Sequence, residues 1–462
     1  MNQVMFEQIR SRGLAHFSYL LGRNGVAAVI DPRRDCEVYV DLVQRRGYQL
    51  RYIIETHRNE DYAIGSLELA RLTGAEIWHA EPQLPYRYGL PVEDGQTFDI
   101  GGLVLRAFHA PGHTEGMMNY VLHDPSGVPW MVFTGDTLLA GDVGRTDLLG
   151  KDRLREAANL LYDTIFGKIL PLGDHVIVCP AHGAGSVCGS ERAADRPLTT
   201  IGIERVHNPA LQHTDRESFV QFVAHELERP PYFTVMERLN LEGPPVLGRL
   251  PGLTPLSVDS FDAQAAGAQV LDTRLELAFN AAHVPGALSI WEQGIPSFAG
   301  WFVNYDQPIL LVSDTILPER AVRYLIRMGF DRINGYLGGG MVDWHTSGRD
   351  SDSIGMVTVQ ELCGLLDSDE QVWILDVRSQ YELDTDGRIP GAHHIHITQL
   401  PQRVDEVPRD VPVFIFCGSG LRSTVAASLL QAQGYEDLTV VLGGAAGWNS
   451  TTCPLDLREA AL

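Results

Sequence analysis

The second half of the chain alternates short apolar runs with segments of helical periodicity. Apolar runs cover residues 372–375, 413–416 and 438–442, and a helical pattern over 423–433 ends at Gly434. Short buried strands that alternate with amphipathic helices are typical of a parallel sheet covered by helices. We therefore predict an α/β fold for this half of the chain.

This α/β pattern occurs twice. Four short motifs recur at an offset of 104 or 105 residues: Leu271, Pro285, Leu337 and Trp344 begin the first copies, and Leu375, Pro390, Leu442 and Trp448 begin the second. A repeat of this period predicts two similar domains rather than one large one. We place them at 253–350 and 355–462, on either side of the polar stretch 347–353.

Residues 1–250 have a different pattern, in which short strands end at side chains that can bind metals. Strands expected over 52–55, 104–108, 130–133 and 176–179 lead to His57, His113, Asp136 and His182. Four such strand ends predict a metal site in this region. Paired prolines at 230–231 and 244–245 predict its boundary with the first repeat.

Length and charge support three domains and exclude some partners. A chain of 462 residues is long enough for about three domains. Its formal net charge of −23 repels phosphate backbones and anionic lipid surfaces. No apolar run reaches the roughly 20 residues of a membrane span, and residues 1–12 lack the pattern of a secretory signal. We expect no nucleic-acid partner, no membrane partner and a cytoplasmic location.

A cysteine loop stands between an expected strand and an expected helix. Its six residues are Cys417, Gly418, Ser419, Gly420, Leu421 and Arg422. Backbone N–H groups, the helix N-terminus and the Arg422 guanidinium would together stabilise a thiolate or a persulfide. An isolated cysteine at a strand end would more often be a buried structural residue. The Cys-x-x-Gly-x-Arg spacing favours a nucleophile.

The second repeat resembles the rhodanese family. The resemblance rests on Asp376-Val377-Arg378, on Gly387 to Ala392, on the cysteine loop and on Leu442-Gly443-Gly444. It implies a sulfurtransferase in which Cys417 is the nucleophile. The first repeat has Val312 or Ser313 at that position, beside Asp314, and we expect it to be a catalytically inactive scaffold.

Residues 1–250 resemble the metallo-β-lactamase superfamily, which implies an αββα sandwich. The resemblance rests on the run from Thr56 to Tyr62 and on the segments around His113, Asp136 and His182. The family motif His-x-His-x-Asp-His is incomplete here, because Asn59 and Tyr62 stand where its second and third histidines should be. Loss of two imidazoles argues against a two-metal hydrolase.

The metal-capable residues that remain are His57, His113 and Asp136. A 2-His-1-carboxylate set leaves coordination positions open on non-haem iron. The chain resembles the persulfide dioxygenase branch, and its domain order resembles bacterial fusions of such dioxygenases with sulfurtransferases. This implies one Fe(II) per chain, with zinc as the alternative, a small-molecule thiol persulfide and O2 as substrates, and sulfite or thiosulfate as products, in a role in sulfide detoxification.

Five further residues are candidates for supporting roles. Asp61 and His182 match ligands of the missing second metal, and we expect them to form hydrogen bonds around the remaining one or to be purely structural. Tyr62 is a further candidate for a supporting or substrate-binding role. Arg145 could hold the anionic end of a thiol substrate or form an ordinary ion pair. Cys188 could accept a sulfur atom or be structural.

Two other functions remain open at this point. One is a glyoxalase-II-like thioesterase with a binuclear zinc site and a sulfurtransferase tail. The other is a persulfide carrier without enzymatic activity. The sequence leaves open the identity of the thiol, the oligomeric state, a homo-oligomer included, and any channelling of sulfite between the two sites.

Overall fold

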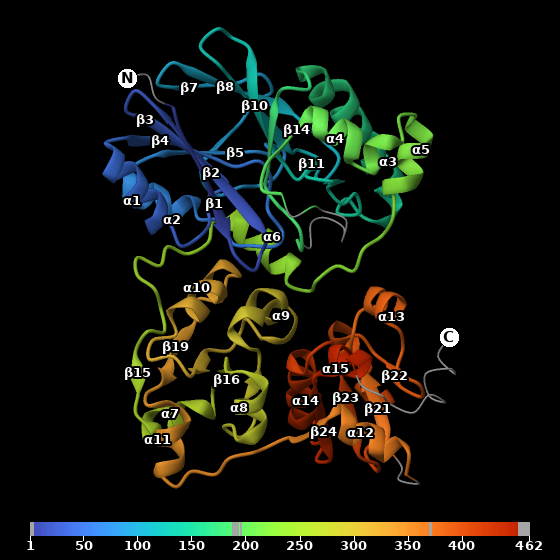
Figure 1. Ribbon diagram of the computed structural model, residues 1–462. Helices are drawn as coiled ribbons and strands as arrows, with labels where there is room; N and C mark the ends of the chain where they lie inside the picture. Colours follow the sequence, from blue (N-terminus) through green and yellow to red (C-terminus); the bar gives the residue numbers. More distant parts are fainter. Residues whose placement is uncertain (1–3, 187–193, 195, 369–371, 451–462) are drawn as a thin grey trace. The chain divides into compact units, whose positions relative to one another are not determined.

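The computed structural model describes residues 4–186, 194, 196–368 and 372–450. It divides into two compact units (Figure 1). The first consists of residues 1–249 with 323–331, and the second of 250–322 with 332–462. Within the described residues, no helix is both long enough and apolar enough to span a membrane.

The first unit contains two six-stranded sheets. One has the order β1 (Met5–Ser11), β2 (His16–Arg23), β3 (Val26–Ile30), β4 (Gln49–Ile54), β5 (Glu76–His79) and β6 (Leu90–Pro91). The other has the order β14 (Thr199–Thr200), β13 (Ile177–Pro180), β10 (Pro129–Gly135), β9 (Met118–His123), β8 (Leu103–His109) and β7 (Thr97–Ile100). A small separate pair is formed by β11 (Leu138–Leu139) and β12 (Asp142–Val143).

The two sheets pack face to face, because one apolar core draws on both. Tyr19 and Ile54 of the first sheet share it with Leu105, Tyr120 and Phe133 of the second. These residues alternate with outward-facing ones along their strands, as they do in packed sheets.

Helices cover the two outer faces. On the first sheet, α1 (Glu37–Arg46) and α2 (Ser66–Thr73) contribute Tyr39 and Leu69 to a second core. On the other, α3 (Leu154–Thr164), α4 (Ile201–His207) and α5 (Arg216–Val223) form a third core with its strands. Helix α6 (Phe233–Glu242) follows. The predicted αββα sandwich is confirmed.

The second unit contains two five-stranded sheets of identical topology. The first has the order β15 (Pro255–Leu256), β19 (Ile333–Leu337), β18 (Ile309–Val312), β16 (Gln269–Asp272) and β17 (Leu288–Ser289). The second has the order β20 (Gly355–Thr358), β24 (Leu438–Leu442), β23 (Val413–Phe416), β21 (Trp373–Asp376) and β22 (His393–His394). All neighbours in both sheets are parallel, which confirms the predicted α/β class.

Helices connect these parallel strands, as crossover connections require. In the first repeat they are α7 (Val258–Ala265), α8 (Glu276–Ala281), α9 (Ile295–Phe302), α10 (Glu319–Arg327) and α11 (Gly340–Thr346). In the second they are α12 (Val359–Leu366), α13 (Gln380–Asp386), α14 (Leu421–Ala432) and α15 (Gly444–Ser450).

Candidate metal centre and cysteine loop

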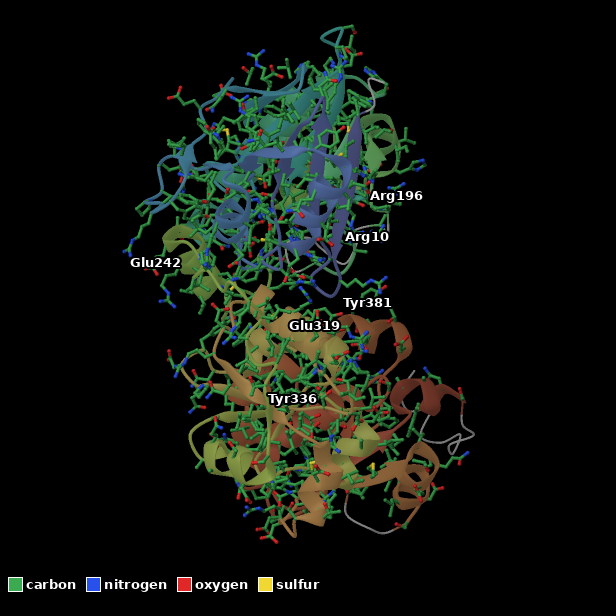
Figure 2. The ribbon with its side chains drawn as sticks, turned by 90° about the vertical axis from the view of Figure 1, so that its left-hand side faces the viewer. Arg10, Arg196, Glu242, Glu319, Tyr336 and Tyr381 are labelled. Carbon is green, nitrogen blue, oxygen red and sulfur yellow. The ribbon has the colours of Figure 1, made fainter. Side chains whose placement is uncertain are left out.

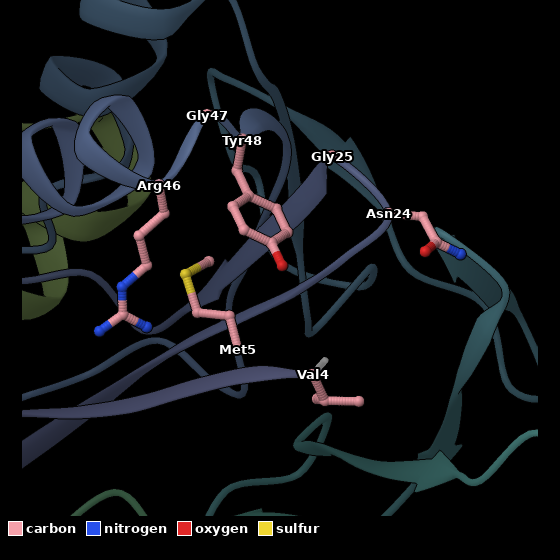
Figure 3. A pocket seen from close by; sticks show the side chains of 7 residues that line it. All are labelled: Val4, Met5, Asn24, Gly25, Arg46, Gly47 and Tyr48. Atoms are coloured by element: carbon pink, nitrogen blue, oxygen red, sulfur yellow. The ribbon is translucent and has the colours of Figure 1, made fainter. Parts of the chain in front are cut away.

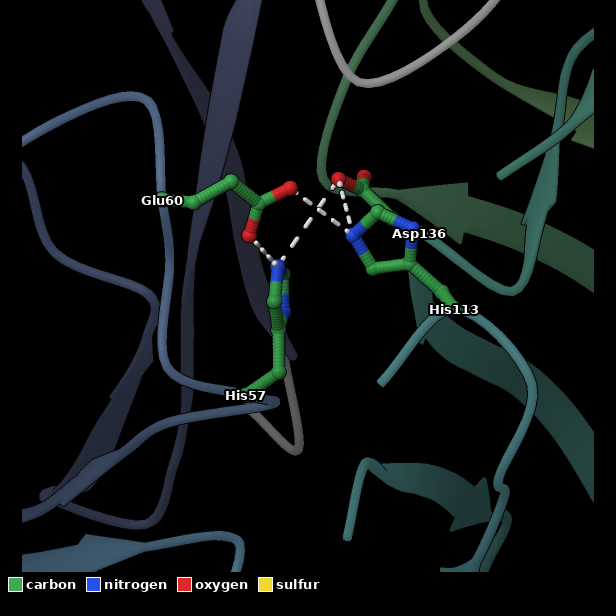
Figure 4. Close-up of side chains that lie close together, drawn as sticks. All are labelled: His57, Glu60, His113 and Asp136. Atoms are coloured by element: carbon green, nitrogen blue, oxygen red, sulfur yellow. Dashed lines mark ion pairs between the residues drawn. The ribbon is translucent and has the colours of Figure 1, made fainter. Parts of the chain in front are cut away.

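The three residues predicted to bind a metal meet in the first unit. His57 follows β4, His113 follows β8 and Asp136 follows β10, and all three side chains are fully buried. Oδ2 of Asp136 lies 3.8 Å from Nε2 of His57 and 3.5 Å from Nε2 of His113 (Figure 4). The strand ends thus bring two imidazole nitrogens and one carboxylate oxygen to a common point.

A fourth side chain, Glu60, reaches the same point. Its Oε1 lies 3.1 Å from Nε2 of His113, and its Oε2 lies 3.9 Å from Nε2 of His57 (Figure 4). One ligand atom from each of the four residues can be chosen so that all lie within 4.8 Å of one another. Glu60 was not among the residues predicted from the sequence, because it occupies an unspecified position of the family motif. Its spacing of three residues from His57 was the available signal.

Each histidine is oriented through its other ring nitrogen. Nδ1 of His57 lies 2.8 Å from Oγ1 of Thr56, which itself donates to Asp31 at 2.8 Å, so the His57 Nδ1–H is the donor. Nδ1 of His113 donates to the backbone carbonyl of Arg145 at 3.0 Å. Metal-binding histidines are commonly held in this way. Both Nε2 atoms are therefore directed to the shared point.

His182 lies between two carboxylates. Its Nδ1 is 2.7 and 2.9 Å from the two oxygens of Asp136, and its Nε2 is 3.0 Å from Oδ2 of Asp61. Burial alone would lower the pKa of His182, but Asp136 and Asp61 raise it well above its usual value. His182 and Asp61 therefore lie behind Asp136, where they fix its orientation.

The electrostatics of the two facing histidines differ. Burial lowers the pKa of His57 to about 4, so its ring is neutral at neutral pH. Burial also acts on His113, but Glu60 and Asp136 outweigh it and raise its pKa to about 9. A proton and a divalent cation compete for the same nitrogen of His113, so metal binding there releases a proton.

The donor set fits a divalent metal ion. Nε2 of His57 is buried and has no hydrogen-bond partner within the described residues. Buried polar atoms are almost always paired, and coordination to a metal would satisfy this nitrogen. Imidazole and carboxylate are ligands that iron and zinc both accept.

The positions expected to hold a second metal carry poor ligands. The side-chain amide of Asn59 donates to the backbone oxygen of His57 at 3.2 Å. The ring of Tyr62 packs against the ring of His16, with centroids 4.0 Å apart. Burial raises the pKa of the Tyr62 phenol well above its usual value, so it stays protonated. These contacts favour a site for one metal.

Arg145 is bound within the fold, and Cys188 lies outside the described residues. The Arg145 guanidinium forms two hydrogen bonds to the Asp147 carboxylate, at 2.6 and 2.7 Å, and donates to the backbone of Leu227 at 3.2 Å. Its side chain is 2% exposed. Arg145 was considered either as a residue that holds the substrate or as part of an ordinary ion pair, and these contacts are those of an ion pair.

The cysteine loop surrounds the sulfur of Cys417 at the end of β23. The Gly420 N–H donates to Sγ at 3.1 Å, and α14 begins at the next residue. Gly444, at φ +45°, lies against the loop, where a Cβ would come 2.1 Å from the Cys417 carbonyl oxygen. The Ala445 N–H donates to this oxygen at 2.9 Å. The Leu442-Gly443-Gly444 motif thus allows close contact with the loop.

Arg422 forms an ion pair with Glu382, for which no role was predicted. Its two terminal nitrogens donate to the oxygens of Glu382 at 2.6 and 2.5 Å. Burial opposes ionisation of Glu382, but hydrogen bonds from Arg422 and Ser379 lower its pKa to about 2. Glu382 lies on α13 beside the exposed Tyr381 (Figure 2). The pair fixes the guanidinium at the loop.

The sheet register identifies the counterpart of Cys417 in the first repeat. Asp376 pairs with Phe416 in the second repeat, as Asp272 pairs with Val312 in the first. Ser313, rather than Val312, therefore occupies the position of Cys417. A serine hydroxyl cannot form a persulfide, so this repeat lacks the sulfur nucleophile.

Helix α14, which begins at the loop, also packs on the first repeat. The buried Asn280 donates to Oγ1 of Thr424 at 3.1 Å. The backbone N–H of Ser289 donates to Oγ of Ser428 at 3.1 Å. These contacts support the expected scaffold role of the first repeat.

Hollows also lie elsewhere in the described part of the chain. One of about 570 Å³ lies beside Asn24, Arg46 and Tyr48, and no histidine, cysteine or carboxylate is among its lining residues (Figure 3). Another, of about 320 Å³, lies beside Arg388 and His394 in the second repeat.

Comparison with protein families gives a family match within each of the two units. Residues 11–182 match the Metallo-beta-lactamase superfamily. Residues 257–347 and 358–451 each match the Rhodanese-like domain. The two separate rhodanese matches agree with the repeat seen in the sequence and in the sheet topology.

Individual relatives cover different shares of the chain. Persulfide dioxygenase ETHE1 of Bos taurus is 30% identical over 260 residues, covering 52% of this chain and 84% of that protein. Hydroxyacylglutathione hydrolase GloC of Haemophilus influenzae is 28% identical over 206 residues, covering 40% of this chain and 87% of that protein. A solved metallo-beta-lactamase from Staphylococcus aureus superposes with a TM-score of 0.65 at 27% identity, covering 73% of this chain and 99% of that one.

Proposed function

This chain belongs to the metallo-beta-lactamase superfamily, among relatives of the persulfide dioxygenases and with two rhodanese-like domains, and we propose that it is an iron persulfide dioxygenase coupled to a sulfurtransferase. The observation that carries this proposal is the set of His57, His113 and Asp136, with Asn59 and Tyr62 in place of two metal-binding histidines. Such a set retains one metal and leaves open positions on it.

In the proposed dioxygenase reaction, a thiol persulfide, O2 and water give the thiol and sulfite, RSSH + O2 + H2O → RSH + H2SO3. The S–S bond breaks, the outer sulfur is oxidised and O2 is the electron acceptor. Fe(II), when bound, would supply the redox chemistry that O2 requires at this site.

The protein residues would hold that centre in place. His57 and His113 are oriented through Thr56 and through the Arg145 carbonyl, and Asp136 through His182. Because all the ligands are buried, bulk water is kept from the metal donors.

In the proposed transfer reaction, the Cys417 thiolate attacks a sulfane sulfur. With thiosulfate, Enz-S⁻ + S2O3²⁻ gives Enz-SS⁻ + SO3²⁻, and the reverse reaction consumes the sulfite made at the iron. The Gly420 N–H, 3.1 Å from Sγ, would stabilise the Cys417 thiolate. Joining both activities in one chain raises the local concentration of sulfite.

A second function is favoured by the match to hydroxyacylglutathione hydrolase. A hydrolase with a binuclear zinc site would need donors at Asn59 and Tyr62, which provide an amide and a protonated phenol.

Metal content and product ratio together decide between the two functions. For protein purified without oxygen, the dioxygenase predicts one iron per chain and one sulfite formed for each O2 consumed with glutathione persulfide. Two zinc ions per chain and oxygen-independent cleavage of a glutathione thioester would establish the hydrolase instead.

A further inference from the structure

We propose that Glu60 is a fourth ligand of the metal, which makes the centre a 2-His-2-carboxylate site. This inference rests on the proposed function, because it takes the metal held by His57, His113 and Asp136 as given. It assigns a role to a residue that the family motif leaves unspecified.

The position of the Glu60 carboxylate carries the inference. Its two oxygens lie 3.1 and 3.9 Å from the Nε2 atoms of His113 and His57, the nitrogens that face the shared point. The carboxylate is fully enclosed, with Glu60 only 1% exposed. Figure 4 shows it on the opposite side of the site from His113 and Asp136, with the ring of His57 pointing between them. The four side chains therefore surround one volume.

The backbone that carries Glu60 is fixed on both sides. Asn240, buried on α6, donates its amide to the backbone oxygen of Asn59 at 2.6 Å and to that of Tyr62 at 2.8 Å. Its Oδ1 accepts from the Ile64 N–H at 2.9 Å. The Asn240 side chain thus holds the backbone on both sides of Glu60. A carboxylate on such a turn is preorganised to act as a metal ligand.

Charge balance supports the same assignment. Two neutral imidazoles and the single Asp136 carboxylate would leave a divalent cation with a net charge of +1 in a fully buried site. A second carboxylate, that of Glu60, brings the net charge of the centre to zero. Burying uncompensated charge is costly, so the neutral centre is the more stable one.

The neighbouring cation, Arg58, is directed to a different carboxylate. Arg58 lies next to His57 and donates to Glu237 at 3.1 Å. The backbone N–H of Arg58 donates to Glu81 at 2.8 Å. Its guanidinium is thus directed to Glu237, and the Glu60 carboxylate faces the histidines.

A fourth protein ligand would leave fewer open positions on the metal than a 2-His-1-carboxylate set does. Glu60 would therefore limit how a persulfide and O2 can bind there together.

Metal affinity tests the assignment independently of turnover. Apo-protein is titrated with Fe(II) without oxygen against a chromophoric competitor, for the wild type, Glu60→Gln and Glu237→Gln. Glu237 is a matched control, because it is an acidic residue near Glu60 that contacts arginines rather than the histidines. We expect Glu60→Gln to weaken Fe(II) binding at least about tenfold and Glu237→Gln to change it less than about twofold.

Equal affinity of Glu60→Gln and wild type, or an equal loss in Glu237→Gln, would overturn the role of Glu60 while leaving the three-residue site intact. Absence of Fe(II) binding by the wild type would overturn the proposed function itself. If Glu60→Gln does not fold, a crystal structure of the Fe(II)-loaded wild type decides. A Glu60 oxygen about 2.0–2.2 Å from the ion supports the assignment, and one beyond about 3 Å overturns it.

Discussion

Both oxygens of Asp136 face a single ring nitrogen of His182, with Nδ1 at 2.7 and 2.9 Å. Oδ2 of the same carboxylate faces the two histidines of the proposed metal centre. His182 thus fixes the orientation of the Asp136 carboxylate, which faces both histidines. Its replacement should affect the metal although it contributes no ligand itself.

We predict that His182→Ala weakens Fe(II) binding about 10- to 100-fold, as loss of a residue that orients a metal ligand typically does. Iron content after dialysis against a chelator measures the effect. His175→Ala, on the surface of the same unit, should keep wild-type iron content. An unchanged content in His182→Ala would mean that Asp136 needs no support from this residue.

Cys417→Ser should abolish sulfur transfer from thiosulfate to a thiol or cyanide and leave persulfide-dependent oxygen uptake intact. The hydroxyl cannot become the nucleophile that the loop stabilises. The control is Ser313→Ala, at the equivalent position of the first repeat, which should leave both activities unchanged. Loss of oxygen uptake in Cys417→Ser would mean that the two sites act in one obligatory pathway.

The pair of Glu382 and Arg422 should stabilise the second unit in a pH-dependent manner. The pKa of Glu382 is lowered from 4.5 to about 2, so its contribution is present above pH 4.5 and is lost as the pH falls through 2. Thermal unfolding should therefore show a larger difference between wild type and Glu382→Gln at pH 5 than at pH 3. A difference that does not change with pH would contradict this assignment.

The contact of Asn280 with Thr424 should stabilise helix α14. We expect Asn280→Ala to reduce the free energy of unfolding of the second unit by about 1–3 kcal/mol, because Thr424 loses a buried donor. Denaturant titration measures the change, with Gln307→Ala at an exposed position as the control. Equal stability of the two variants would show that the first repeat does not support α14 through this bond.

Much of this fold follows from local patterns. The apolar runs predicted the parallel strands of both repeats, and the strand ends located His57, His113 and Asp136. Periodicity and motif spacing suffice here, because each depends on residues near one another in the chain.

Other features depend on tertiary contacts and could not be predicted in the same way. The turn that carries Glu60 is held by Asn240, which lies far along the chain. Glu382 reaches Arg422 from a different helix. The choice of Ser313 over Val312 as the counterpart of Cys417 required the strand register, which repeat offsets of 104 and 105 leave ambiguous.

Oxygen consumption by the iron-loaded protein with a panel of persulfides tests the central claim most directly. We predict uptake with at least one small-molecule thiol persulfide, one sulfite formed per O2, and loss of uptake in His57→Ala. Uptake that persists in His57→Ala, or none with any persulfide in iron-loaded wild type, would contradict a dioxygenase at this centre.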